Sequence, residues 1–384
     1  ALFIGIYVLD RVPLLRRYNI PAAVFGGLVV ALAITMFREF DIATVKFDTT
    51  LQAPLMTAFF TSIGLSASLQ LLKTGSRQAL VFLGLATFIA VVQSLIGMAT
   101  ALLFDQPLLL GVLMGPAALT GGPATALAFA PQFAAAGVAS AESVAIAAAM
   151  SGIVLGGLVG GPLVTKLLEK HHLKSASAAL PQSPIESTEP SLLNDDEASL
   201  LAVLKGISVL LIAMGIGAWL GGLMKSANLT LPGYVGAMLM GAVIRNIDDK
   251  TAWFKIPHGV TERVGVVCLT LFLAVALMNL KLWELTSIAM PLLVNLVLQV
   301  IVVCFFCWFV VFKVMGNDYD AAVMSGGFIG FMLGTTANAM AVMHSVVQRY
   351  GPSPRAFLVA PIVGAFFIDF TNALLITGLL NMLS

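Results

Sequence analysis

The chain has 384 residues, of which 59% are hydrophobic and only 10% are charged, and its formal net charge is +1. A soluble domain carries about 25% charged residues, so this composition excludes a soluble globular protein. The apolar runs do not alternate between apolar and polar residues as membrane β-barrel strands do. The chain also has no basic run that would indicate binding to nucleic acid. The composition therefore predicts an all-α polytopic membrane protein embedded in a lipid bilayer.

Ten apolar segments are expected to belong to transmembrane helices, because charged clusters bound them and their apolar length suffices, except for 1–9, which is too short to span and is interpreted as the tail of a first helix. They are 1–9, 20–36, 51–72, 78–103, 141–164, 203–222, 231–244, 264–280, 286–312 and 357–380. Two further apolar pieces, 107–135 and 321–347, are interrupted by glycine and polar residues. Each of these two pieces is predicted to form a helical hairpin.

The distribution of basic residues predicts how the chain is oriented. If the chain begins outside, 16 of the 20 Lys and Arg residues fall on the cytoplasmic side. The four that fall outside are Arg38, Lys46, Lys225 and Lys281. Cytoplasmic loops of membrane proteins are enriched in Lys and Arg. We therefore expect both termini to be extracytoplasmic.

A single long hydrophilic stretch, 170–199, divides the chain. It contains three prolines and an acidic second part, which is typical of a linker. The predicted organisation is a first half over 1–169, a cytoplasmic linker over 170–199 and a second half over 200–384.

The two halves resemble each other at a constant spacing. An offset of 212 residues pairs Gly122 with Gly334, and it also pairs Asp105 with Asn317. Five spans per half make the second half enter the membrane from the side opposite to the first. Inverted repeats of this kind are typical of secondary transporters, whose binding sites lie near the bilayer midplane where broken helices meet.

The hairpin tips are candidates for substrate binding. Each hairpin arm has about 13 residues, so at about 1.5 Å per residue it reaches past the middle of the bilayer. Glycine permits a turn and a close approach of a ligand, and helix N-termini attract carboxylates. The predicted substrate-binding residues are Thr120, Gly121, Gly122, Thr125, Gly334, Thr335, Thr336 and Asn338. The alternative interpretation is that these glycines only let helices pack closely.

Asp369 is expected near the bilayer centre, about 12 residues into the last span, where an aspartate costs about 2.5–3.5 kcal/mol. Asn372 follows one helical turn later. Carboxylate and amide oxygens are suited to Na⁺, so the predicted sodium ligands are Asp369, Asn372 and Asn338. The same oxygens suit a proton relay equally well. A neutral aspartic acid bonded to a neighbouring helix is the structural alternative.

Other polar residues at depth are expected to form hydrogen bonds between helices. They are Gln93, Asn279, Asn295, Gln299, Ser66 and Ser68, of which the two serines are also candidates for the cavity wall. No catalytic pair of carboxylates, zinc signature or nucleophile–base set is recognisable. We therefore expect no enzyme activity, no organic cofactor and no metal beyond sodium.

Several stretches resemble the bacterial sodium/glutamate symporter family. They include "ALTGGPATA", "GFMLGTTANAMA", "VALMNLKLWEL" and "VGAFFIDFTNALLI", and the resemblance runs from "RYNIPAAVFGGLVVAL" to the last span. It implies a homodimer of inverted five-helix halves with re-entrant hairpins. It also implies Na⁺ as the coupling ion, glutamate as the substrate, and a transport unit that moves relative to a dimerising scaffold.

The first hairpin departs from the family pattern. The family's first hairpin has a tip similar to Gly-Gly-His-Gly-Thr, whereas residues 121–125 read Gly-Gly-Pro-Ala-Thr. Neither hairpin contains Arg or Lys. Another amino acid or a monocarboxylate is therefore an alternative substrate, and proton coupling is an alternative to Na⁺. From other classes, a channel or a structural or sensory membrane protein are the rival interpretations.

Overall fold

The computed structural model describes residues 1–11, 21–40, 47–70, 76–175, 196–226, 233–253, 255–281, 285 and 288–383. All regular structure within these ranges is helical, which confirms the predicted all-α class. Five segments of the described chain are long and apolar enough to cross a membrane. They belong to α6 (Ser76–Leu103), α9 (Ala141–Lys170), α10 (Asp196–Ser226), α12 (His258–Met278) and the stretch from α13 to α14 (Ala289–Val314). The chain is therefore a multi-pass membrane protein.

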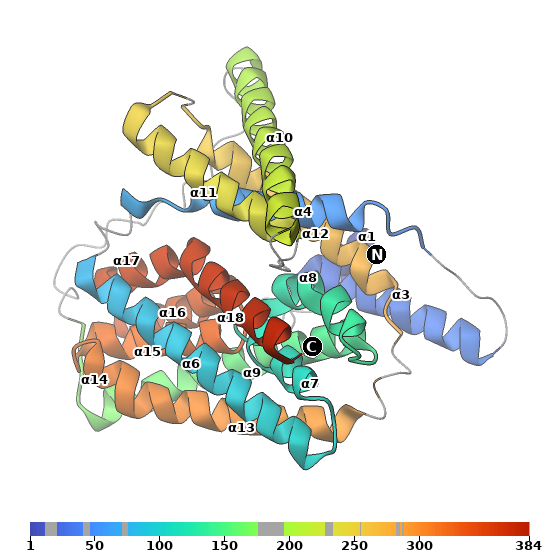
Figure 1. The fold of residues 1–384 in the computed structure, drawn as a ribbon. Coiled ribbons are helices and arrows are strands. Elements are labelled where there is room, and N and C mark those ends of the chain that lie inside the picture. Colours follow the sequence, from blue (N-terminus) through green and yellow to red (C-terminus); the bar gives the residue numbers. More distant parts are fainter. Residues whose placement is uncertain are drawn as a thin grey trace.

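The helices form two groups that the chain visits alternately (Figure 1). The first, which we call the α4 group, contains α1 (Leu2–Arg11), α3 (Ala22–Glu39), α4 (Gln52–Ser66), α10, α11 (Gly233–Thr251) and α12. Helix α4 packs against α11 and α12, and α3 packs against α12. Helices from both halves of the sequence therefore lie side by side in this group.

The second group, which we call the hairpin group, contains both interrupted segments (Figure 1). From the first half it takes α6, α7 (Leu108–Val112), the π-helical turn η1 (Leu113–Ala117), α8 (Gly122–Ala135) and α9. From the second half it takes α13 (Ala289–Phe306), η4 (Cys307–Val311), α14 (Phe312–Val314), α15 (Tyr319–Met332), α16 (Thr336–Tyr350), α17 (Pro354–Ile362), η5 (Val363–Phe367) and α18 (Ile368–Leu383). Each half of the sequence thus contributes to both groups.

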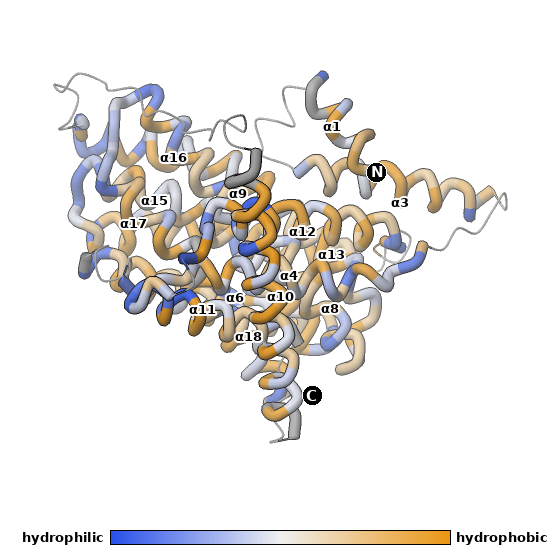
Figure 2. The backbone as a smooth tube through the Cα atoms, turned by 90° about the horizontal axis from the view of Figure 1, so that it is seen from above, coloured by the Kyte–Doolittle hydropathy of each residue, from blue (hydrophilic) through white to orange (hydrophobic). Residues whose placement is uncertain are grey.

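Apolar packing and small residues hold the hairpin group together. Its main core joins buried side chains of α6, α9, α13, α15 and α17, with Phe82 and Phe328 in edge-to-face contact at 5.3 Å. Hydrophobic residues cover most of the helical length (Figure 2). A Cβ on Gly97 would lie 2.1 Å from the carbonyl oxygen of Gly111, so α6 and α7 touch backbone to backbone. Small residues permit such close crossings of membrane helices.

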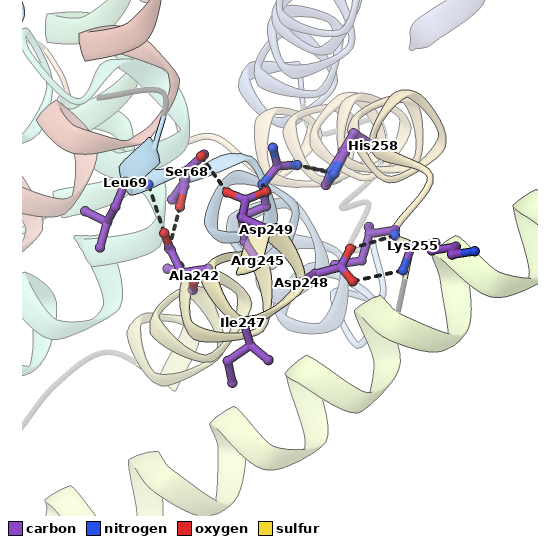
Figure 3. A network of polar contacts seen from close by, with 12 residues as sticks. Ser68, Leu69, Ala242, Arg245, Ile247, Asp248, Asp249, Lys255 and His258 are labelled. Carbon is purple, nitrogen blue, oxygen red and sulfur yellow. Dashed lines mark hydrogen bonds and ion pairs between the residues drawn. The ribbon is translucent and has the colours of Figure 1, made fainter. Parts of the chain in front are cut away.

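The prediction of one helix over 51–72 is wrong at its C-terminal end, because α4 stops at Ser66. After this helix end, the backbone is held by side chains of α11. Asn246 donates to the carbonyl oxygen of Ala67 at 2.8 Å and accepts from the N–H of Leu69 at 2.9 Å. Ser68 donates to Asp249, which also pairs with Arg245 at 3.0 Å (Figure 3). The segment after α4 is therefore clamped to the end of α11.

Two further sequence predictions are modified by the structure. Helices α9 and α10 extend into the predicted linker 170–199, and the central part of that linker, 176–195, lies outside the described residues. The last predicted span, 357–380, is divided into α17, η5 and α18. The π-helical turn η5 ends two residues before Asp369, and such turns are frequent at functional sites.

Candidate functional site

The first hairpin is broken where its sequence weakens a helix. Gly115 has non-helical dihedral angles, and Pro116 has no N–H to donate to the preceding turn. The chain then turns through residues 118–121 before α8 begins at Gly122. Gly122 has a φ of +64°, a conformation that glycine adopts without steric cost. The interruption therefore runs from Gly115 to Gly121, and the turn predicted near Gly121 and Gly122 lies at its end.

The second hairpin turns over residues 333–335, as the position of Gly334 predicts. Helix α15 ends at Met332, and α16 begins at Thr336. Thr335 is extended and caps α16, because its hydroxyl accepts from the N–H of Asn338 at 3.3 Å. Threonine is a favoured residue at this position.

The two tips are in contact although they lie more than 200 residues apart in the chain. A Cβ on Gly122 would lie 2.8 Å from Cγ2 of Thr335 and 3.0 Å from the carbonyl oxygen of Gly334. Gly152 of α9 supports both tips, since a Cβ there would lie 2.6 Å from Leu119 and 2.5 Å from the carbonyl oxygen of Leu333. The N-termini of α8 and α16 therefore meet at one place, and each carries a partial positive charge.

A cavity of about 500 Å³ lies against these tips, between the hairpin group and the α4 group. Its wall on the hairpin side includes Thr120, Gly121, Thr125, Thr335, Thr336 and Asp369. The opposite wall consists mainly of apolar residues from α4 and α12, together with Ser62, Ser66 and Glu262. Among the described residues that line the cavity, two are acidic and none is basic. The cavity therefore combines helix N-termini and hydroxyl groups with a negative charge.

Six of the ten residues predicted for substrate and sodium binding line this cavity, and four lie behind it. Gly122 and Gly334 form the contact between the tips. Asn338 is 1% exposed and donates from Nδ2 to the carbonyl oxygen of Ile153 in α9 at 3.2 Å. Asn372 is equally buried and donates from Nδ2 to the carbonyl oxygen of Pro116 at 2.9 Å. The Asn372 amide therefore holds backbone of the first hairpin, and the Asn338 amide holds α16 against α9. The structure places neither amide on the cavity wall beside Asp369.

The oxygen atoms around Asp369 have few competing partners. No hydrogen bond or ion pair joins the Asp369 carboxyl group to another described residue, so the alternative of an aspartic acid bonded to a neighbouring helix is not seen among these residues. Oδ1 of Asn372 is buried without a hydrogen-bond partner among the described residues. Thr336 donates to the carbonyl oxygen of Gly364 at 3.0 Å, which ties the second tip to η5. Oxygen ligands of this type suit a hard cation.

Sequence reasoning did not identify Glu262 as part of the cavity. It precedes the predicted span 264–280, where a charged residue indicates only the boundary of a span. In the structure α12 begins at His258, and Glu262, Val266, Leu269 and Leu273 form one face of this helix. Of the two serine candidates for the cavity wall, Ser66 is on the wall and Ser68 is bonded to Asp249 instead.

The family model that matches this chain is described as sodium/glutamate symporter, and it matches residues 1–352. A sodium/glutamate symporter of Haemophilus influenzae is 36% identical over 377 residues, which cover 98% of this chain and 93% of the relative. A sodium/glutamate symporter of Escherichia coli strain K12 is 38% identical over 391 residues, which cover 98% of this chain and 94% of the relative. Similarity therefore extends over nearly the full length of both relatives.

Proposed function

Because the chain belongs to the sodium/glutamate symporter family, we propose that it couples inward movement of Na⁺ to uptake of glutamate or a related amino acid. The observation that carries this proposal is the cavity between the two helix groups. It holds both hairpin tips and the carboxylate of Asp369, which has no partner among the described residues. These are the elements that a carrier of a cation and an anion requires at one place.

The substrate carboxylates bind at the hairpin tips. Neither hairpin has an Arg or Lys side chain, so the positive end of each helix supplies the attraction. Helix α8 has no capping side chain at Gly121, and Pro123 in its first turn has no N–H, so the N–H groups of Gly122 and Ala124 are the ones open to a ligand. Hydroxyl groups of Thr125, Thr335 and Thr336 lie on the same wall and contribute hydrogen bonds to the substrate.

Sodium binds at Asp369. The carboxylate supplies the charge. Oδ1 of Asn372, which is buried without a partner among the described residues one helical turn further along α18, supplies a neutral oxygen from behind the cavity wall. The amide nitrogen of Asn372 is already bonded to Pro116, which orients this oxygen and links the ion site to the first hairpin. Asn338 contributes by holding the second hairpin against α9. A cation at Asp369 would also offset the negative charge that opposes an anionic substrate.

The chain is built from two inverted repeats, 1–169 and 200–384, joined by a cytoplasmic linker over 170–199. Asp105 and Asn317, which the 212-residue offset pairs, both have a left-handed backbone, with φ of +52° and +56°. Both lie just before a hairpin. The hairpins 107–135 and 321–347 are re-entrant, since each returns from its tip to the side of the membrane where it began.

Alternating access follows from motion of the hairpin group relative to the α4 group. The cavity lies at their boundary, so a relative displacement exposes the ligands first to one side and then to the other. The α4 group is the scaffold of a homodimer in the bacterial inner membrane, with both termini extracytoplasmic. Exposed apolar side chains of α10, such as Leu211, Ile212 and Trp219, support its contact with lipid or a second copy.

Uptake of labelled L-glutamate into proteoliposomes tests the proposed function. Accumulation should require an inward Na⁺ gradient and should be saturable, which distinguishes a carrier from a channel. An equal K⁺ gradient should give none. Accumulation driven by a proton gradient instead of Na⁺ would support the alternative of a proton-coupled carrier. Lack of uptake with folded protein would redirect the search to other amino acids and to monocarboxylates.

A further inference from the structure

We propose that Gln93 is a positioning residue that joins the two hairpin tips and fixes the Thr120 hydroxyl as a hydrogen-bond acceptor for the substrate's ammonium group. This inference rests on the proposed transport function and deepens it. Gln93 is a buried residue of α6 outside the cavity wall, and its bond determines that the hydroxyl of Thr120, on the wall, accepts a hydrogen bond from the ligand.

Gln93 contacts both tips at once. Its Nε2 donates to the carbonyl oxygen of Met332 at 2.7 Å, and its Oε1 accepts from the hydroxyl of Thr120 at 2.6 Å. Met332 is the last residue of α15, and Thr120 lies in the turn before α8. Gln93 is 1% exposed and Thr120 is 5% exposed. The two bonds are therefore shielded from water. Hydrogen bonds in such a buried environment are electrostatically stronger than in water.

The chemistry of the partners settles the direction of both bonds. The carbonyl oxygen of Met332 can only accept, so the amide nitrogen of Gln93 must face it. The amide oxygen then faces Thr120, and an oxygen that only accepts requires the threonine hydroxyl to donate. The proton of Thr120 is thus used within the protein. Its oxygen lone pairs remain for the cavity, where they suit an ammonium group and not a carboxylate.

Helix α13 holds Gln93 itself in place. Nε2 of Gln299 donates to the backbone oxygen of Gln93 at 2.9 Å, and Nδ2 of Asn295 donates to the backbone oxygen of Met114 at 2.9 Å. Gly115 permits this approach, because a Cβ there would lie 2.8 Å from the same oxygen of Gln93. A side chain with its backbone fixed in this way loses little further freedom when it bonds to the tips.

The consequence is a division of labour at the tips. The N-termini of α8 and α16 attract the substrate's carboxylates, while Thr120 accepts from its ammonium group. The cavity can then distinguish an amino acid from a dicarboxylate of the same length that lacks the amine. A site discriminates in this way because its buried polar group is left without a partner when a ligand that lacks the amine binds.

The test compares Gln93→Met, Thr120→Val and Thr120→Ser, each alone, and the double variant Gln93→Met/Thr120→Val. Thr100→Val is the matched control, since Thr100 is also a buried threonine but, among the described residues, bonds only to Ile96 of its own helix. The readouts are the KM for Na⁺-driven glutamate uptake, inhibition by glutarate, which lacks the amine, and the thermal unfolding midpoint. The wild-type protein in the same assay tests the proposed function separately.

We expect Gln93→Met and Thr120→Val each to raise the KM for glutamate about tenfold, the effect of losing one buried hydrogen bond. Both should narrow the preference for glutamate over glutarate by a similar factor. Thr100→Val should retain the wild-type KM and preference, and Thr120→Ser, which keeps the hydroxyl group, should raise the KM far less than Thr120→Val. The effect of the double variant on the KM should be smaller than the product of the two single effects, because both changes remove the bond between Gln93 and Thr120.

The inference would be overturned if the effects of the two changes on the KM were fully additive in the double variant, or if Thr120→Val kept the wild-type preference for glutamate over glutarate. Thr120→Val alters one side chain at the cavity wall and therefore keeps the inference testable if Gln93→Met does not fold. Absence of glutamate uptake by the wild-type protein would refute the proposed function alone. The link between Gln93 and Thr120 would then be tested by non-additivity of the unfolding midpoints.

Discussion

At the scale of single residues, Asp369 dominates the site because it brings a carboxylate into a wall of hydroxyl groups and apolar side chains. None of the described residues lining the cavity is basic, so the partner of this charge has to come from solution. A cation in a desolvated site depends strongly on its charged ligand. Asn372 and Thr336 also fix backbone next to the site, at Pro116 and Gly364.

Replacing Asp369 by Asn should abolish Na⁺-driven uptake, because the amide offers an oxygen without the charge. We expect the rate in a Na⁺ gradient to fall about a hundredfold or more, to the level seen with K⁺. The thermal unfolding midpoint should not fall, since a charge is removed from a largely apolar wall. Asp48→Asn, which changes an exposed acidic residue, is the control and should transport normally. Retention of Na⁺ stimulation in Asp369→Asn would refute the assignment of the ion site.

At the scale of the helical elements, the contact between the two hairpin tips depends on Gly122. A Cβ added at Gly122 would clash with Thr335, and the left-handed φ of this position would strain any other residue. Gly122→Ala should therefore separate the tips and reduce uptake about tenfold, given a strain of about 1–3 kcal/mol. Gly137 is a matched control, because its φ is +91° but nothing lies within 4 Å of the place that an added Cβ would occupy.

Gly137→Ala should destabilise the fold without changing the KM for glutamate. Kinetic measurements on both variants, together with their unfolding midpoints, separate backbone strain from the loss of the tip contact. Equal KM values in Gly122→Ala and the wild-type protein would show that the tips need not touch for transport.

The clamp between the end of α4 and α11 is a second prediction at this scale (Figure 3). Asn246 bonds to backbone groups of Ala67, Leu69 and Ala242. Asn246→Ala leaves these groups without their partner and should lower the free energy of unfolding by about 1–3 kcal/mol. Thr251→Ala, which removes an exposed hydroxyl at the end of α11, should change it by less than about 0.5 kcal/mol. Similar unfolding midpoints for the two variants would contradict the clamp.

At the scale of the whole molecule, the ligands lie between two helix groups, so binding should stabilise their arrangement. A ligand present at a hundred times its Kd stabilises a folded protein by about 2.7 kcal/mol. We expect Na⁺ and L-glutamate together to raise the thermal unfolding midpoint of the purified protein, while K⁺ and L-glutamate should not. Stabilisation that is equal in K⁺ would show that Asp369 does not link ion and substrate binding.

The sequence by itself determined the class of the protein and the position of its interruptions. Apolar length and sparse charge are properties of each segment alone, and they predicted a helical membrane protein. Glycine and proline act through their own backbone, so the breaks near Gly122 and Gly334 were also predictable. The family that the sequence motifs resemble, the sodium/glutamate symporters, is confirmed by the family model that matches residues 1–352.

Only the tertiary structure decided which residues share the cavity. Asn338 and Asn372 have the chemistry of ion ligands, but the direction of a side chain depends on the helices around it, and both amides bind backbone behind the wall. Glu262 and Gln93 owe their places to the crossing of α12 with α4 and of α6 with both tips. Contacts between segments far apart in the chain leave no periodic signal in either segment, and for that physical reason packing had to reveal them.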